Sequence, residues 1–425
     1  MRVLYVSYAD VRGGRFNGYA LLEAQDSFEG FAAEMAVWRK DGHRDDVHHL
    51  HRGRVRLANG VTRRLSWPLG LDGLLGLGGA SLLRLPAFSA ADVIHLQVIH
   101  NGPWFSVAWL PWLARQKPVV WTIHEVWPMT GTCQHSASCS KWLDSCGGRC
   151  PRPLDASPLD HYSPALLWQA KRLVYSHSSC RLIVASDWTR SRVERSPLLR
   201  RFPRTQIPFG VDLDVFSPVH RGEARAQLGL DDDEPVIAFR GVSVDKDNVK
   251  GMISLQNALR SLDVDRPTTL LIVDDGRAYV DVGGRYRVRD LGWMDEQALG
   301  RVLAAADVFV VSLDQESFCL MAAEAMAAGT PMIAFEGTAA AEIIRPPEGG
   351  VLAPAREGKA LAATIRSLLA DRALRLRLRR SSRLLAEREY GFETYVRRHL
   401  AVYDSVCAAH PQAPSAPGRN RAAGR

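Results

Sequence analysis

Short, uninterrupted apolar runs alternate with longer stretches of helical periodicity along most of the chain. The first half contains the runs RVLYVSYA, DVIHLQV, PVVWTIHE and RLIVASD, and the second half contains PVIAFRGV, TTLLIVDD, DVFVVS and PMIAF. Continuous apolar runs are typical of parallel strands buried on both faces, and strands that alternate with helices indicate β–α units. The pattern therefore predicts an α/β protein built on parallel sheets.

A break in this rhythm divides the chain in two. The segment IPFGVDLDVFSPVHRGEARAQLGLDDDEP is rich in proline, glycine and acidic residues, and strands resume after it. Because 425 residues are too many for one hydrophobic core, we predict Rossmann-like domains at residues 1–210 and 211–407, with a boundary near Pro208–Pro218. Residues 408–425 are rich in Pro, Ala, Gly and Arg without periodicity, and we predict that they are disordered.

The composition is that of an ordinary globular protein, with 46% hydrophobic and 24% charged residues. No apolar run reaches the roughly 18–20 residues of a membrane-spanning helix. The apolar core of the N-terminal MRVLYVSYADVRGG is also shorter than that of a signal peptide. We therefore expect a cytoplasmic protein, in which clustered cysteines favour a metal over disulfides.

The net charge of +8 lies entirely in the first half of the chain. Residues 1–215 contain 26 lysines and arginines against 18 aspartates and glutamates, whereas residues 216–425 contain 28 of each kind. Such a surplus is either ordinary solvated charge or a face for an anionic partner. The anionic partners that we consider are the inner face of the membrane, touched at its periphery, and a pyrophosphate-linked acceptor.

Residues 307–331 read DVFVVSLDQESFCLMAAEAMAAGTP and contain two glutamates, Glu316 in a loop after a strand and Glu324 in the helix that follows. Residues eight apart lie on similar faces of one helix. A carboxylate accepts two hydroxyl hydrogen bonds, as a ribose or sugar diol offers, and a helix N-terminus binds phosphate. The Ala-rich surroundings fit poorly with a solvated helix face.

This segment closely resembles the signature E-x7-E followed by AMAAGTP of the retaining GT-B glycosyltransferases of glycosyltransferase family 4. The resemblance implies two Rossmann-like domains that face each other across a cleft, and transfer of a sugar from a nucleotide-sugar donor. In the family the first glutamate contacts the donor sugar and the second holds the nucleotide ribose. Those roles fall on Glu316 and Glu324, with Phe318, Cys319 and Leu320 as further donor-binding residues.

Other segments resemble the same family in order along residues 1–400. The glycine loop after the first strand matches at Gly13 and Gly14, the active-site histidine at His124, and the Lys-Gly pair that neutralises the donor pyrophosphate at Lys250. The segments IPFGVDLDVFSP, VASDWTRSRVERSPLL, GTAAAEII and GGVLAP also match.

Three positions depart from the family pattern. Phe209 replaces an asparagine, Val242 replaces an arginine, and Gly337-Thr338 replaces a Gly-Gly pair. A catalytically impaired, sugar-binding relative is therefore the alternative to an active enzyme.

The resemblance also implies how the reaction proceeds. Lys250 and helix N-termini balance the pyrophosphate, so that catalysis requires no metal. The family retains anomeric configuration by front-face transfer, in which the leaving phosphate helps to deprotonate the acceptor hydroxyl. Because neighbouring residues on a strand point to opposite faces, we take His124 as the site residue and Glu125 as its structural neighbour.

The segment HEVWPMTGTCQHSASCSKWLDSCGGRCP gathers four of the seven cysteines. Their spacing, C-x5-C-x6-C-x3-C, favours a structural zinc site at Cys133, Cys139, Cys146 and Cys150, with two disulfides or plain thiols as alternatives. A similar block occurs in family 4 enzymes that build bacterial exopolysaccharides of the colanic-acid type. That resemblance implies a glycan or lipid-linked oligosaccharide as the acceptor.

Two further classes of protein compete with a glycosyltransferase. A GT-B nucleotide-sugar epimerase shares the domain rhythm, but the E-x7-E motif with AMAAGTP argues against it. A zinc-containing nucleic-acid-binding protein requires basic and aromatic residues interleaved around the zinc unit, and only Lys141, Arg149 and Arg152 lie near it. We therefore expect no nucleic-acid partner.

Overall fold

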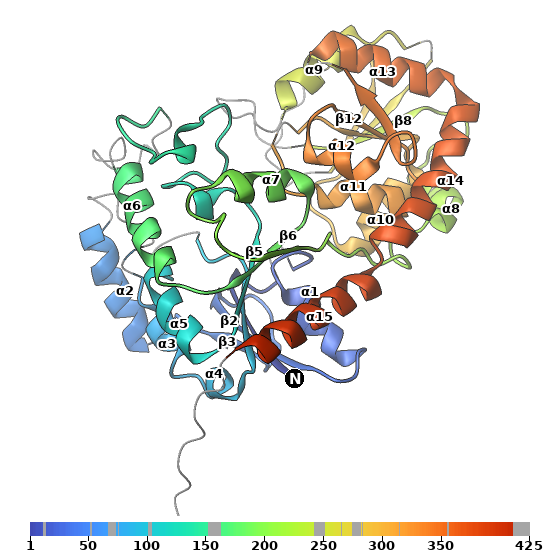
Figure 1. Ribbon diagram of the computed structural model, residues 1–425. Coiled ribbons are helices and arrows are strands. Elements are labelled where there is room, and N and C mark those ends of the chain that lie inside the picture. Colours follow the sequence, from blue (N-terminus) through green and yellow to red (C-terminus); the bar gives the residue numbers. More distant parts are fainter. Residues whose placement is uncertain are drawn as a thin grey trace, which may run out of the picture. The chain divides into compact units, whose positions relative to one another are not determined.

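The computed structural model describes residues 1–11, 14–51, 53–66, 74, 76–100, 104–151, 163–241, 251–264, 266–273, 282, 284–313, 315–354 and 357–410. The chain forms two compact units (Figure 1). The first unit consists of Met1–Thr122, Pro153–Leu182 and Leu400–Arg425, and the second consists of Ile123–Arg152 and Ile183–His399. Among the described residues, no helix is both long and apolar enough to cross a membrane.

The first sheet has seven strands in the order β3-β2-β1-β4-β5-β6-β7. Their bounds are β1 Arg2–Ala9, β2 Ala32–Arg39, β3 Val47–His49, β4 Val93–Leu96, β5 Val119–Ile123, β6 Arg181–Val184 and β7 Arg204–Gln206. Strand β1 pairs in parallel with β2 on one side and β4 on the other, so that Val3 lies beside both Ala33 and Val93. Strand order reverses at β1, as in doubly wound nucleotide-binding sheets.

The second sheet has six strands in the order β10-β9-β8-β11-β12-β13, and every neighbouring pair is parallel. Their bounds are β8 Val236–Arg240, β9 Thr269–Val273, β10 Arg287–Asp290, β11 Val308–Val311, β12 Met332–Phe335 and β13 Gly350–Ala353. This order repeats that of the first six strands of the other sheet, with the reversal between β8 and β11. The prediction of two Rossmann-like parallel sheets is confirmed.

Helices connect the strands in both units. Their bounds are α1 Tyr19–Glu23, α2 Gly53–Ser66, α3 Gly78–Leu82, α4 Pro86–Ala90, α5 Leu110–Gln116, α6 Ser163–Ser176, α7 Asp187–Arg195, α8 Arg221–Gln227, α9 Met252–Ser261, α10 Glu296–Ala305, α11 Leu320–Ala327, α12 Ala339–Ile344, α13 Gly358–Ala370, α14 Arg372–Glu389 and α15 Phe392–Ala409. In the second unit α9 and α13 lie side by side over the sheet (Figure 1), and their apolar residues share one core with β8, β9 and β11.

The division into units differs from the predicted boundary at residues 210 and 211. Residues 123–152 group with the second unit, whereas the chain from Leu400 onward groups with the first. The second difference has a clear cause, because Tyr403 is fully buried and its hydroxyl lies 2.7 Å from His95 Nδ1 on β4. Helix α15 extends to Ala409, into the predicted tail, and residues 411–425 lie outside the described part of the chain.

Candidate functional site

The reversal of strand order between β8 and β11 defines the crevice where open α/β sheets bind ligands, at the carboxyl ends of the strands. Strand β11 ends at Val311 and is followed by the buried Ser312. Gly251, the residue before α9, packs directly against this strand end. Its φ is +67°, and a Cβ atom there would lie only 1.7 Å from the carbonyl oxygen of Ser312. Glycine is therefore required for the two loops to touch.

The loop that carries Glu316 is fixed by the residues on both sides of it. Gln315 makes two hydrogen bonds to one residue of the Cys-rich segment: its Oε1 accepts from the N–H of Ala137 at 3.0 Å, and its Nε2 donates to the carbonyl of Ala137 at 2.6 Å. The carbonyl of Ser317 accepts hydrogen bonds from the buried hydroxyls of Ser186 and Thr189. Glu316 itself is half-buried, and the loop that carries its carboxylate is anchored on both sides.

A row of aromatic rings continues from this loop. Phe318 is only 1% exposed and contacts the ring of Phe209 edge-on, with centroids 5.3 Å apart. Phe209 in turn stacks on His124, with centroids 5.7 Å apart and 11° between the planes. On its other side Phe318 meets Tyr390 at 5.8 Å. Phe209, which stands where the family has an asparagine, thus links His124 to the loop that carries Glu316.

Helix α11, which carries Glu324, begins at Leu320. Cys319 has a left-handed backbone with φ of +66°, which interrupts the chain between loop and helix, and its side chain makes no capping hydrogen bond. Only Glu324 therefore lies in the helix, whereas Glu316 lies in the loop. Glu324 is 1% exposed among buried alanines, which rules out a solvated helix face. Burial of a carboxylate is costly, so this position is unusual for a purely structural helix.

The glycine loop of the first unit follows β1. Gly14 donates its N–H to the carbonyl of Val11 and accepts from the N–H of Ala20, both at 3.0 Å. A Cβ at Gly14 would lie 3.1 Å from the carbonyl oxygen of Val11, a tight contact that glycine avoids. Gly13 and Lys250 lie outside the described residues, as does Val242.

The Cys-rich segment between β5 and residue 151 contains short 3-10 turns at Trp127–Met129 and Lys141–Leu143. Ala137 and Cys146 have left-handed backbones, with φ of +45° and +50°. The ammonium of Lys141 donates to two carbonyls of the same segment, those of Gly147 and Arg149. The segment is thus braced by its own backbone and by Gln315.

All seven cysteines lie in the described part of the chain, and none of them is disulfide-bonded. A structural zinc site needs four ligands around one point. Within the described residues, no three or more histidine, cysteine or acidic side chains come together in that way. The zinc assignment to Cys133, Cys139, Cys146 and Cys150 therefore stays a prediction from their spacing.

Sequence reasoning could not find three parts of this site. The contacts of Gln315 with Ala137, and of Ser317 with Ser186, join residues more than 100 positions apart. Phe209 is visible in the sequence only as a departure from a family pattern. The one available signal was indirect, namely that the Cys-rich segment follows the strand that ends at His124.

Comparison with known proteins places this geometry in a class. The fold is that of GT-B glycosyltransferases. The sucrose-phosphate synthase of Thermosynechococcus elongatus superposes with a TM-score of 0.68 at 20% identity, over 96% of this chain and 100% of that chain. WaaG, a glycosyltransferase involved in lipopolysaccharide biosynthesis, gives 0.61 at 16% identity, over 97% and 100%.

Sequence comparison finds similarity over parts of the chain. Residues 234–371 match the family described as glycosyl transferases group 1. A D-inositol 3-phosphate glycosyltransferase of Xylanimonas cellulosilytica is 32% identical over 221 residues, 48% of this chain and 52% of that protein. A phosphatidyl-myo-inositol mannosyltransferase of Mycobacterium leprae is 29% identical over 233 residues, 51% and 60%. The chain thus spans about half the length of the first of these relatives.

Proposed function

We propose that the protein is a glycosyltransferase that moves a sugar from a nucleotide-sugar donor to an acceptor hydroxyl, with retention of configuration. One observation carries this proposal: the loop around Glu316 is anchored on both sides at the carboxyl ends of β8 and β11. It lies within the segment that matches the glycosyltransferase family. An anchored carboxylate is what a site needs in order to hold a reacting sugar in one orientation.

Each site residue has a role in the proposed reaction. Glu316 contacts the donor sugar and Glu324 binds the ribose, while Phe318, Cys319 and Leu320 line the donor at the start of α11. The N–H groups of that helix start and Lys250 balance the leaving pyrophosphate. Gly13 and Gly14 let the backbone approach the donor or acceptor, and His124 faces the reacting sugar. No metal takes part in this chemistry.

Two classes of acceptor are proposed. A glycan or lipid-linked oligosaccharide, in exopolysaccharide or cell-envelope synthesis, is supported by the Cys-rich block. An inositol phosphate is supported by the names of the relatives, which are D-inositol 3-phosphate and phosphatidyl-myo-inositol enzymes. Both classes of acceptor present several hydroxyls, and a phosphorylated acceptor of either class suits the basic first half of the chain.

We also propose a cytoplasmic protein with peripheral membrane contact through its first unit. Helix α2 supports this contact, because Leu57 and Val61 are one turn apart and 73% and 57% exposed. Arg56 and Arg64 on the same helix are exposed as well. Exposed apolar residues flanked by arginines are typical of helices that lie in a membrane interface.

A structural zinc ion bound by Cys133, Cys139, Cys146 and Cys150 stays part of the proposal on cysteine spacing alone. It requires about one zinc ion per chain after anaerobic purification. Zinc content near zero by elemental analysis would remove it, without affecting the proposed reaction.

Donor binding tests the proposed site. A panel of nucleotide sugars is added to the protein, and the melting temperature is measured, since a ligand of the folded state raises it. We expect at least one nucleotide sugar to raise the melting temperature of the wild type, and Glu324→Gln to abolish that rise. The control Glu194→Gln changes an exposed glutamate on α7 and is expected to keep it. No response to any donor, or an equal response of Glu324→Gln, would contradict the proposed site.

A further inference from the structure

A cavity in the second unit has six arginines among its fourteen lining residues. Its volume is about 560 Å³. The basic residues that line it are Arg221, Arg225, Arg266, Arg372, Arg375 and Arg379. They come from α8, from the chain before β9 and from α14. A cavity of this size suits a small molecule and not a macromolecule.

This cavity lies at the opposite edge of the sheet from Glu316. Two of its lining residues, Pro235 and Asp307, stand immediately before β8 and β11. They therefore mark the amino ends of the two strands whose carboxyl ends carry the proposed donor site. Because substrates of such sheets bind at the carboxyl ends, the arginine-lined cavity is a separate feature.

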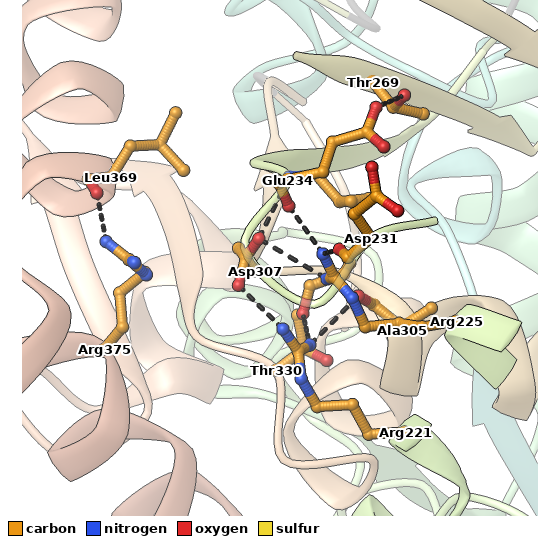
Figure 2. Close-up of polar contacts among 12 residues, drawn as sticks. Arg221, Arg225, Asp231, Glu234, Thr269, Ala305, Asp307, Thr330, Leu369 and Arg375 are labelled. Carbon is orange, nitrogen blue, oxygen red and sulfur yellow. Dashed lines mark hydrogen bonds and ion pairs between the residues drawn. The ribbon is translucent and has the colours of Figure 1, made fainter. Parts of the chain in front are cut away.

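Asp307 is the partly buried acid among the lining residues, and Figure 2 shows its polar contacts. It pairs with Arg221 at 2.9 Å and with Arg225 at 3.6 Å. Arg225 is 1% exposed, and its guanidinium also donates to the carbonyls of Ala305 and Glu234 at 2.9 and 2.6 Å. These carbonyls accept hydrogen bonds but carry no net charge. Among these contacts, the single negative charge of Asp307 therefore faces the positive charges of two guanidinium groups.

The side of the cavity formed by α14 adds further positive charge. Arg375 donates to the carbonyls of Leu368 and Leu369 near the end of α13, and Figure 2 shows the contact with Leu369. Arg379 donates to the carbonyl of Ala306 at 3.0 Å. Burial and, to a smaller degree, the neighbouring Arg221 lower the pKa of Arg379 from 12.5 to about 9. The cavity therefore holds more positive charge than its surroundings neutralise.

Capping of helix carbonyls explains part of this cluster but not all of it. The Nε atom of Arg225 and the Nη1 atom of Arg379 are buried, and no atom of the described residues accepts a hydrogen bond from either. A buried donor that lacks an acceptor costs about 1–3 kcal/mol. Both side chains line the cavity, whereas these two nitrogen atoms are themselves closed to solvent. The acidic residues of the rim, Asp232 and Asp233, are exposed.

We propose that this cavity binds a small phosphorylated anion, as a ligand site distinct from the donor site. Guanidinium groups bind phosphate oxygens through paired, charge-assisted hydrogen bonds. The phosphate belongs to an inorganic ion, a sugar phosphate or a nucleotide, since all of them present the same oxygens to the arginines. This proposal does not depend on the transfer activity.

Calorimetric titration of the full chain with inorganic pyrophosphate, at constant ionic strength, tests the site. The double variant Arg266→Gln/Arg372→Gln removes two exposed arginines of the cavity rim, so that folding is preserved. We expect it to weaken binding by about 100-fold, since each charge-assisted contact contributes about tenfold or more. The control Arg377→Gln/Arg380→Gln removes two exposed arginines of α14 that do not line the cavity, and is expected to stay within twofold of wild type.

Two further titrations distinguish binding at the cavity from binding at the donor site, and one source of phosphate from another. Lys250→Gln is expected to retain pyrophosphate binding at the cavity. Titration with glucose 6-phosphate and with adenosine monophosphate shows which source of phosphate binds more tightly. Absence of pyrophosphate binding to the wild type, equal binding by the rim variant, or complete loss in Lys250→Gln would each overturn the proposal.

Discussion

The bridge between Gln315 and Ala137 allows a sharp test of how the Glu316 loop is held. Gln315→Ala removes two hydrogen bonds of 3.0 and 2.6 Å. At about 1 kcal/mol each, they stabilise the anchored loop by about 2 kcal/mol. Because 1.4 kcal/mol corresponds to tenfold, the loss of the bridge lowers the population of the anchored loop by at most about 30-fold. We expect kcat/KM to fall by roughly 10- to 30-fold.

The assay is release of nucleoside diphosphate from the best donor, together with thermal melting of each variant. Gln315→Glu keeps an acceptor for the N–H of Ala137 but sets a carboxylate against its carbonyl, so we expect a loss at least as large. Gln227→Ala serves as the control, since its amide bonds only the exposed Glu223. If Gln315→Ala stays within twofold of wild type in kcat/KM, the bridge does not organise the loop and the reasoning is refuted.

Three other predictions concern the same unit. Gly251→Ala is expected to lower the free energy of unfolding in urea by well over the roughly 1–2 kcal/mol that a left-handed alanine costs. Gly284→Ala, at a φ of +73° with open space around it, is expected to lose only that backbone contribution. Equal losses in the two variants would contradict the contact between Gly251 and Ser312. Phe209→Leu removes the stack on His124 and should lower turnover by about two- to twelvefold, at about 0.5–1.5 kcal/mol per ring pair. An unchanged rate would show that the stack does not contribute to turnover. Burial lowers the pKa of His399 from 6.5 to about 4. On acidification the unfolded chain therefore binds the proton first, and the free energy of unfolding should fall by about 3 kcal/mol between pH 6.5 and 4. His399→Gln should reduce this pH dependence in melting experiments.

Much of the fold was readable because it depends on local patterns. All eight apolar runs of the sequence form strands, and the two-fold rhythm correctly indicated two parallel sheets. Strands buried on both faces need continuous apolar runs, and this requirement shows in one sequence. The predicted runs did not include β2, β3, β7, β10 and β13. Of these, β10 and β7 read RVRD and RTQ, which are too polar to stand out.

The anchoring of the site could not be predicted, because it depends on contacts between distant residues. Nothing near Gln315 in the sequence indicates that its amide meets the backbone of Ala137, 178 positions away. The left-handed Cys319 also hides the start of α11, since a cysteine there carries no signal of a helix break. The spacing of the cysteines is a local pattern, and the zinc site that it predicts awaits measurement of bound metal.

The proposed reaction is tested most directly by turnover of the donor at Glu316. Nucleoside diphosphate release is measured with a panel of nucleotide sugars and both classes of acceptor, for the wild type, Glu316→Gln and the exposed control Glu194→Gln. We predict turnover by the wild type and the control, and a loss of about 100-fold or more in Glu316→Gln, the size seen when one preorganised transition-state contact is removed. Absence of turnover with every donor, or a wild-type rate in Glu316→Gln, would contradict a glycosyltransferase that acts at this site.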